Sequence, residues 1–261
     1  MTIHKPPFVI HQYPSLPSTN DHLKSLLEAP EFTVIVADEQ TAGRGRRQRI
    51  WHSSPGDGLY FSVLLRPESF TSSLALISLF AGIAVAEALV HLGVAGVDIK
   101  WPNDVLISGR KVSGILSEGA SSAPSAARVI VGIGVNLNHA SFPAELEEAA
   151  TSVFMTTGQR IEMSPFLDQL LDRLRAWYEV WAAGGDMKVI ARWEELSSYA
   201  FGQQVRVTTD EEELDGLTQG LATNGGLVVR TASGQLRTIL AGEVSRLRKQ
   251  DRLNNKVRDN A

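Results

Sequence analysis

The pattern of apolar and polar positions divides the chain into two parts. In residues 18–200, short β-branched segments alternate with apolar or amphipathic segments of helical length, which is typical of a mixed α/β (α+β) domain. In residues 201–248, short strand-like segments are separated by Gly-containing turns, and helical spacing is absent. The second pattern predicts a small β-barrel behind the α/β domain.

Strands are predicted where β-branched and aromatic residues are concentrated. In the first part these segments are 32–37, 59–65, 97–100, 105–108, 111–116 and 128–138. The segments on either side of Gly109 are expected to pair as a hairpin with a tight turn. The last strand contains Gly132 and Gly134. Because glycine weakens a strand, this pair indicates the close approach of a ligand or of another backbone.

Helical spacing predicts helices at 72–92, 143–149, 164–182 and 186–197, and a helix that begins at Ser18. The 72–92 segment is nearly all apolar and is followed by Gly93, a residue typical of a left-handed helix cap. Its uncharged run is shorter and more polar than the ~20 residues of a membrane span. A helix buried within the domain is therefore favoured, and no membrane association is expected.

Two end segments are expected to lie outside these domains. Residues 1–17 are short and interrupted by proline, so we expect an N-terminal extension. They are too short for a helix-turn-helix, which takes about 20 residues, so DNA binding is not expected. The polar residues 249–261 are expected to form a frayed tail, and the small residues of 120–127 a mobile loop.

Composition limits the chemistry that the chain can carry. A formal net charge of −4 over 261 residues argues against a protein that mainly grips phosphate backbones. The absence of cysteine excludes disulfides, thiolate metal sites and a cysteine nucleophile, and it fits a reducing cytoplasm. The N-terminus has no apolar core of a signal peptide. We therefore expect a cytoplasmic protein.

One short segment stands out against this acidic background. Between residues 44 and 49 there are four arginines, spaced by glycine and followed by Trp51. Glycine lets a backbone approach a ligand closely, and the arginine fork matches carboxylate and phosphate oxygens. The segment 41–52, which we call the arginine loop, is therefore a candidate anion-binding loop. The alternative at this point is a solvated basic turn or a nucleic-acid contact.

Further polar groups accompany this loop along the chain. Lys100 leads into a Pro-fixed turn that carries Asn103 and Asp104, and Lys111 begins the next strand. There is no plausible Ser/His/Asp triad in sequence context, no His-Glu-x-x-His motif and no P-loop motif. Several cations without a nucleophile suit electrostatic catalysis on phosphate, in which the substrate supplies the nucleophile.

Taken in order, these motifs resemble those of the biotin–protein ligases. Over residues 18–138 the chain carries Ser18-Thr19-Asn20, Gln40, the glycine–arginine segment 43–51, Lys100-Trp101-Pro102-Asn103-Asp104, the segment 111–116 and the segment 132–136. Several ordered motifs are far more specific than any one of them. The resemblance implies a mixed-sheet catalytic domain of the biotin/lipoate ligase type, followed by an SH3-like C-terminal β-barrel.

The resemblance also implies a reaction. Biotin and ATP would form biotinyl-5′-AMP, with Mg²⁺ shielding the phosphates, and a lysine of a biotin carboxyl carrier protein would then accept biotin. Biotin would be bound by Ser18, Thr19, Asn20, Gln40, Arg44, Gly45, Arg46, Lys111 and Gly114. ATP and the adenylate would be bound by Arg46, Arg49, Trp51, Lys100, Asn103, Asp104 and Asn136. The expected catalytic residues are Lys100, Arg46 and Lys111, and Asp104 is a candidate Mg²⁺ contact.

Two details of the arginine loop lead to further hypotheses. Gln48 stands where the family usually has glycine, so it would be strained if the position needs a positive φ. Mutual repulsion among the arginines suggests that the loop is disordered without ligand and orders over the intermediate.

Other functions were weighed against this one. A lipoate–protein ligase shares the catalytic fold, but the arginine loop and the 100–104 motif favour biotin. A biotin-responsive repressor would need a DNA-binding domain, for which residues 1–17 leave no room. A non-enzymatic biotin-, anion- or RNA-binding module is disfavoured by the acidic net charge and by the other motifs. A homodimer agrees with the family resemblance, although the pairing edge cannot be read from the sequence.

Overall fold

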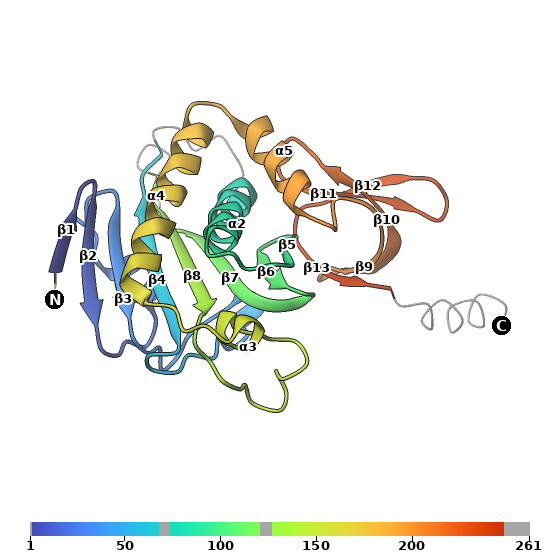
Figure 1. Cartoon of the computed structure of the whole chain (residues 1–261). Coiled ribbons are helices and arrows are strands. Elements are labelled where there is room, and N and C mark those ends of the chain that lie inside the picture. Colours follow the sequence, from blue (N-terminus) through green and yellow to red (C-terminus); the bar gives the residue numbers. More distant parts are fainter. Residues whose placement is uncertain (1, 68–73, 121–126, 248–261) are drawn as a thin grey trace.

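An eight-stranded mixed sheet carries the first part of the chain (Figure 1). The structure is a computed structural model that describes residues 2–67, 74–120 and 127–247. The strand order is β1-β2-β3-β4-β8-β7-β6-β5, in which β2 and β3 are parallel and all other neighbours are antiparallel. The strands are β1 (Thr2–Lys5), β2 (Phe8–Tyr13), β3 (Thr33–Ala37), β4 (Gly58–Leu65), β5 (Val97–Lys100), β6 (Asp104–Ile107), β7 (Arg110–Gly119) and β8 (Val129–Asn136).

Helices cover both faces of this sheet. They are α1 (Thr19–Ser25), α2 (Leu74–His91), α3 (Val153–Thr157), α4 (Met163–Ala182) and α5 (Asp186–Leu196), with a 3₁₀ turn η1 (Arg46–Gln48) in the arginine loop. On one face α2 packs against the sheet and against α4 and α5. On the other face α1 covers β3, β4 and β8, and its Leu23 packs with Ile35, Leu64 and Ile130. Successive side chains of a strand point to opposite faces of the sheet, and helices cover both faces here. The central strands therefore carry apolar residues on both faces.

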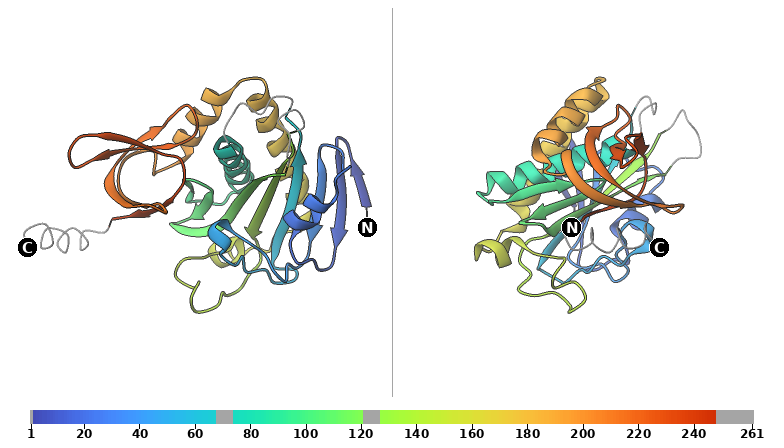
Figure 2. Two further views of the ribbon diagram at one scale, coloured as in Figure 1. Left: turned by 180° about the vertical axis from the view of Figure 1, so that it is seen from behind. Right: turned by 90° about the vertical axis from the view of Figure 1, so that its right-hand side faces the viewer.

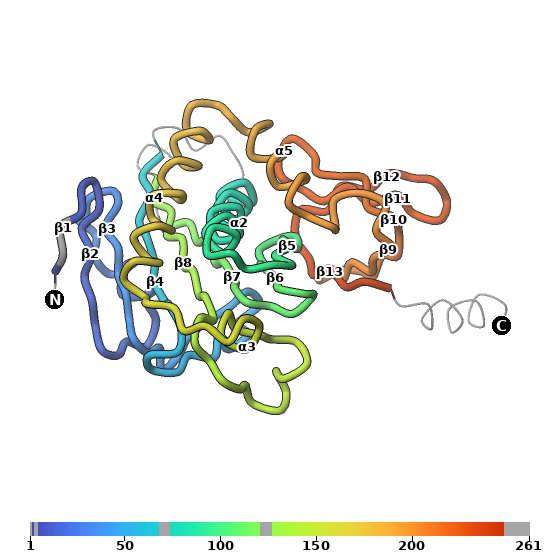
Figure 3. The backbone as a smooth tube through the Cα atoms, viewed as in Figure 1, coloured from blue at the N-terminus to red at the C-terminus, as the bar shows by residue number. Residues whose placement is uncertain are grey.

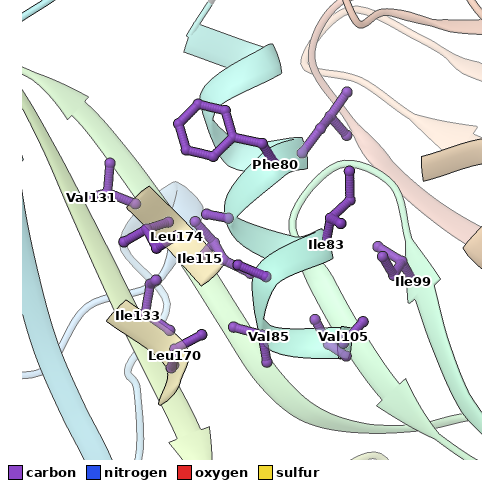
Figure 4. Close-up of a cluster of buried hydrophobic side chains, with 14 of the residues drawn as sticks. Phe80, Ile83, Val85, Ile99, Val105, Ile115, Val131, Ile133, Leu170 and Leu174 are labelled. Atoms are coloured by element: carbon purple, nitrogen blue, oxygen red, sulfur yellow. The ribbon is translucent and has the colours of Figure 1, made fainter. Parts of the chain in front are cut away.

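The apolar segment around α2 forms a core helix, as predicted. The described part of this helix is long and apolar enough to cross a membrane, but 67% of it is buried inside the protein. Figure 4 shows Phe80, Ile83 and Val85 among the side chains that gather between α2, the sheet and α4. Gly93 has φ +78°, which confirms the left-handed position expected after the helix.

The second part of the chain forms a separate five-stranded antiparallel sheet with the order β12-β11-β10-β9-β13. Its strands are β9 (Phe201–Thr208), β10 (Glu213–Leu221), β11 (Leu227–Thr231), β12 (Leu236–Ile239) and β13 (Glu243–Arg246). Figures 2 and 3 show this curved sheet at the opposite end of the molecule from β1 and β2. A buried hydrogen bond from Trp101 Nε1 to the Gly225 carbonyl (3.0 Å) joins the two parts. The predicted mixed α/β fold with a C-terminal β-domain is confirmed.

Two predictions were wrong. Residues 1–17 are not simply an extension, because they contribute β1 and β2 to the sheet, where the alternate residues Phe8 and Ile10 are buried. The helix expected at 143–149 consists of turns, and the short helix α3 follows instead. In place of a helix, the segment has turn hydrogen bonds such as Leu146 N to the Pro143 carbonyl and Ala149 N to the Leu146 carbonyl. The segments 121–126 and 248–261, and residues 72 and 73 of the predicted helix, lie outside the described residues.

Candidate functional site

A cavity of about 430 Å³ opens on the face of the sheet below the arginine loop. Every residue that the sequence assigned to the site lines this cavity. These residues are Ser18, Thr19, Asn20, Gln40, Arg44, Gly45, Arg46, Arg49, Trp51, Lys100, Asn103, Asp104, Lys111, Gly114 and Asn136. The structure therefore brings together motifs that span more than a hundred residues of the chain, while the role assigned to each residue stays a prediction.

One end of the cavity is formed by hydroxyl and amide groups at the start of α1. Ser18 caps the helix, since its Oγ accepts a hydrogen bond from the Asp21 amide (3.3 Å). The Gln40 carbonyl Oε1 accepts from the Thr19 backbone amide at 2.8 Å. Asn20 donates through Nδ2 to the Glu118 carboxylate at 2.7 Å and to the Leu116 carbonyl at 3.3 Å. We call this group the amide end of the cavity.

Cations gather at the other end. Lys111 Nζ lies 2.6 Å from Asp104 Oδ1, and Lys100 Nζ lies 3.6 Å from the other oxygen of the same carboxylate. The Asp104 carboxylate thus lies between two ammonium groups and offsets their mutual repulsion. Lys111 Nζ also lies 5.4 Å from the centre of the Trp51 ring, within reach of a cation–π interaction. We call this group the lysine end of the cavity.

Two asparagines expected on the adenylate side line the cavity but use their amide nitrogens on the backbone. Asn103 Nδ2 donates to the Ile115 carbonyl at 2.7 Å, and Asn136 Nδ2 donates to the Thr151 carbonyl at 3.1 Å. Each therefore fixes a neighbouring segment. Their side-chain carbonyls are the groups through which they could meet a ligand.

The expected metal contact does not fit a cation. Within the described residues, no group of three or more His, Asp or Glu side chains is arranged to hold a metal ion. The two oxygens of Asp104 face the ammonium groups of Lys111 and Lys100. A metal cation at this carboxylate would be a third positive charge and would be repelled by both ammonium groups. We therefore derive no catalytic step through a metal held by Asp104.

Glycines of β7 and β8 form the floor of the cavity. A Cβ on Gly132 would lie less than 3.0 Å from the Asn20 side chain, and one on Gly134 or Gly114 would lie as close to the Trp51 ring. Side chains of the protein therefore approach these glycines, whereas the sequence had suggested a ligand or another backbone. The small residues leave room for Asn20 and for the indole ring on the sheet.

The arginine loop is attached to the C-terminal sheet. Arg46 donates to the Gly242 carbonyl (3.1 Å), Arg47 pairs with Asp210 (2.7 Å), and Arg49 pairs with Glu243 (2.6 Å). Arg44 instead pairs with Asp21 and lies 3.9 Å from Glu118. Burial, together with the neighbouring charge of Arg47, lowers the pKa of Arg46 from its ordinary value. An anion in the cavity would offset that desolvation, which suits Arg46 to a phosphate or carboxylate ligand.

Several cavity residues were missed in the sequence. Glu243 and Val244 come from the C-terminal sheet, and Phe142 and Leu146 come from the turns after β8. His139, stacked on Phe142, is buried, and burial lowers its pKa. No motif spacing connects these segments to the arginine loop. In the sequence, the one available signal was the dipeptide Gly242-Glu243 at the start of β13.

Comparisons with known proteins place this fold in a defined class. Residues 13–136 match the Biotin/lipoate A/B protein ligase family, and residues 200–247 match the Biotin protein ligase C terminal domain. The structure of the biotin protein ligase from Aquifex aeolicus in complex with biotin and ATP is similar, with a TM-score of 0.81 and 33% identity over 92% of this chain and 99% of that chain. The fold is thus that of the ligase class that includes biotin and lipoate ligases.

Sequence relatives narrow the class. The chain is 35% identical over 215 residues to the biotin--[acetyl-CoA-carboxylase] ligase of Paracoccus denitrificans, which covers 80% of this chain and 88% of that protein. It is 37% identical to the bifunctional ligase/repressor BirA of Bacillus spizizenii, covering 79% of this chain but only 64% of that relative. The chain belongs to the biotin–protein ligase family.

Backbone strain at Gln48 is a first testable feature. Arg47 and Gln48 both have positive φ, at 53° and 58°. The left-handed region costs an L-residue about 1–2 kcal/mol, and a glycine at the same position avoids this cost. Part of that gain is offset, because glycine also has more conformational freedom in the unfolded chain. We expect Gln48→Gly to raise the free energy of unfolding by about 0.5–1 kcal/mol in urea denaturation. The control Gln159→Gly, at an exposed position without positive φ, should lower it; equal losses at both positions would contradict the strain.

The ion pair between Arg49 and Glu243 supports a second prediction. The pair joins two partly exposed side chains, so it should contribute about 0.2–1 kcal/mol to holding the loop. We expect Glu243→Ala to accelerate trypsin cleavage of the ligand-free arginine loop about two- to five-fold. Glu212→Ala removes a comparable pair with Arg237 in the same sheet and should leave cleavage of the loop unchanged. Equal cleavage rates in the Glu243 variant and the wild type would rule out this attachment.

Proposed function

We propose that this chain catalyses the ATP-dependent attachment of biotin to a lysine of an acceptor protein, through biotinyl-5′-AMP. The observation that carries the proposal is the joining, in one cavity, of an amide end with a lysine end beneath an arginine loop. Membership of the biotin–protein ligase family supports it, as does the similarity to a ligase whose structure holds biotin and ATP.

In the first step, a carboxylate oxygen of biotin attacks the α-phosphorus of ATP. The new P–O bond forms as the bond from the α-phosphorus to the bridging oxygen breaks, and pyrophosphate leaves with the electron pair. Two anions must approach each other, so cations have to offset their repulsion. Lys111, Lys100 and Arg46 line the cavity and would offset this repulsion, and Asp104, which contacts both lysines, would hold them in position.

In the second step, the neutral amine of an acceptor lysine attacks the acyl carbon of the mixed anhydride. The C–N bond forms, the C–O bond to the phosphate breaks, AMP leaves, and the amine loses a proton. The arginine loop would retain biotinyl-5′-AMP until the acceptor arrives, because hydrolysis by water would waste the activated acid. We expect ligand to slow trypsin cleavage of this loop.

The amide end favours biotin over lipoate as the acid. Gln40, whose carbonyl is engaged by Thr19, is left with its NH₂ group as a hydrogen-bond donor beside the cavity. Hydroxyl and amide groups on this side suit a ring that carries both N–H and C=O groups. The ring of lipoate carries neither, so it would leave these buried groups unpaired.

Finer points of the proposal concern the partners. The acceptor would be a biotin carboxyl carrier domain, as the name of the Paracoccus relative suggests. Mg²⁺ would be bound mainly by the phosphates of ATP, since the lysine end repels cations. A cytoplasmic location fits the lack of cysteine. A homodimer and the absence of DNA binding stay predictions.

Biotin-dependent exchange of labelled pyrophosphate into ATP tests the first step directly. Exchange with biotin and Mg²⁺, and none with lipoate, is the expected result. Exchange with lipoate alone would mean that the fold is right and the acid is wrong. Tight biotin binding without any exchange would identify a binding protein and overturn the proposed enzyme.

A further inference from the structure

Two polar residues lie behind the amide end of the cavity without lining it. Ser62 on β4 is fully buried, and its Oγ lies 2.6 Å from Asn20 Oδ1 and 2.7 Å from Thr19 Oγ1. Glu118 on β7 accepts from Asn20 Nδ2 at 2.7 Å. Neither residue belongs to a motif from which ligand binding is predicted, yet together they contact Thr19 and Asn20, which do line the cavity.

The orientation of the Asn20 amide is determined by its neighbours. A carboxylate and a backbone carbonyl, of Glu118 and Leu116, face one end of this amide, and both groups only accept hydrogen bonds. The NH₂ group must therefore lie at that end. The carbonyl oxygen of Asn20 then faces Ser62, which has to donate its single hydroxyl hydrogen to it.

In this orientation, neither Ser62 nor Gln40 donates a hydrogen bond to Thr19 Oγ1. Once Ser62 has given its hydrogen to Asn20, the contact between Ser62 and Thr19 needs the hydroxyl hydrogen of Thr19. Thr19 Oγ1 also lies 3.1 Å from Gln40 Oε1, which can only accept and already accepts from the Thr19 backbone amide, so the Thr19 hydroxyl gives its hydrogen either to Ser62 or to Gln40. The lone pairs of Thr19 Oγ1 then receive no hydrogen from this chain of groups. A side chain that is only 3% exposed and lines the cavity has to find that donor in a ligand.

We propose that Glu118 is a positioning residue that sets the direction of this hydrogen-bond chain, so that Thr19 Oγ1 accepts from a ring N–H of the ligand. The inference rests on the proposed function and deepens it, because a cyclic urea such as the ring of biotin supplies that N–H. Without the carboxylate, Asn20 can turn its NH₂ group toward Ser62. Ser62 then donates to Thr19, Thr19 donates to Gln40, and the need for a ligand N–H is reduced.

A double-mutant cycle on biotin affinity, measured by isothermal titration calorimetry, tests this coupling. The variants are Glu118→Gln, Thr19→Val and the double variant. We expect Glu118→Gln to weaken biotin binding about 10-fold and Thr19→Val about 30-fold, from the cost of unpaired buried groups. The double variant should bind no more than about two-fold more weakly than Thr19→Val, because the two changes remove one interaction. Ser117→Ala, the neighbour on β7 that pairs with Ser78 outside the cavity, should bind like the wild type.

The cycle separates the proposal from simpler roles of Glu118. If the two losses multiply to about 300-fold, Glu118 acts independently of Thr19, for example through Arg44, and the inference is wrong. Glutamine keeps a side-chain carbonyl that can still accept from Asn20, so the cycle is repeated with Glu118→Ala, which removes the acceptor altogether. If both Glu118 variants bind biotin like the wild type, the inference is overturned too. A wild-type protein that binds no biotin would instead refute the proposed function, and this inference with it.

Discussion

Replacing Lys111 by alanine is expected to lower the rate of biotin-dependent pyrophosphate exchange by about 10³-fold, the scale of losing one preorganised charge donor at a reacting oxyanion. Lys111 Nζ lies 2.6 Å from Asp104, within a cavity that Arg46 and Lys100 also line. Its loss removes a cation and also leaves the Asp104 carboxylate less well neutralised. Both changes oppose the approach of the biotin carboxylate to the α-phosphate.

Two further variants make this prediction specific. Arg110→Ala removes a positive charge from the preceding residue of β7, which does not line the cavity, and should keep exchange within about two-fold of the wild type, as surface charges contribute little. Adding Asp104→Ala to Lys111→Ala should slow exchange less than Asp104→Ala slows the wild type, because part of the role of Asp104 is to hold Lys111. Exchange by Lys111→Ala within ten-fold of the wild type would exclude a catalytic role for this lysine.

Gly132→Ala is expected to weaken biotin binding by about 100-fold, the scale of a site residue displaced by about 1 Å. Gly132 lies on β8 between Ser62 of β4 and Leu116 of β7, directly beneath Asn20. An added Cβ would come closer to Asn20 than real Cβ atoms do. Asn20 cannot yield without losing its hydrogen bonds to Glu118, Leu116 and Ser62, so the start of α1 has to move.

Gly119→Ala is the matched control for this change. Gly119 is paired with β8 in the same sheet, and a Cβ there would meet nothing within 4 Å. It should bind biotin with the wild-type affinity in the same calorimetric titration. Melting temperatures of both variants separate a local displacement from unfolding. Equal biotin affinity of Gly132→Ala and wild type would show that the amide end tolerates movement of Asn20.

Local features were predicted well where a short segment determines its own structure. Ser18 caps α1 as expected, because the hydroxyl and the Asp21 amide that it binds are three residues apart. The hairpin of β6 and β7 turns at Ser108 and Gly109, both with positive φ, which suits a two-residue turn. The apolar run of α2 identified the core helix by its length and lack of charge.

Predictions failed where the structure of a segment depends on residues that are near it in space but far from it in the sequence. The alternation of Phe8 and Ile10 is too short to reveal that β2 pairs in parallel with β3. The segment 143–149 has helix-forming residues but forms turns, in which the Ala149 carbonyl accepts a hydrogen bond from the Lys111 amide at the start of β7 (2.8 Å). The purpose of Gly132 could not be read from the strand alone, since its neighbour Asn20 is more than a hundred residues away in the sequence.

By itself, the sequence determined which cations, amides and glycines this protein carries and in which order, and therefore indicated the family to which the chain belongs. Side-chain identity decides which ions and hydrogen bonds are available, and that information is local. Only the tertiary structure decided which partners these side chains contact and how the side chains are oriented. It attaches Arg49 to Glu243 of the second sheet, places Asp104 between two lysines, and orients Asn20 by Glu118. Those directions depend on distances of a few ångströms between residues far apart in the chain, which no local pattern encodes.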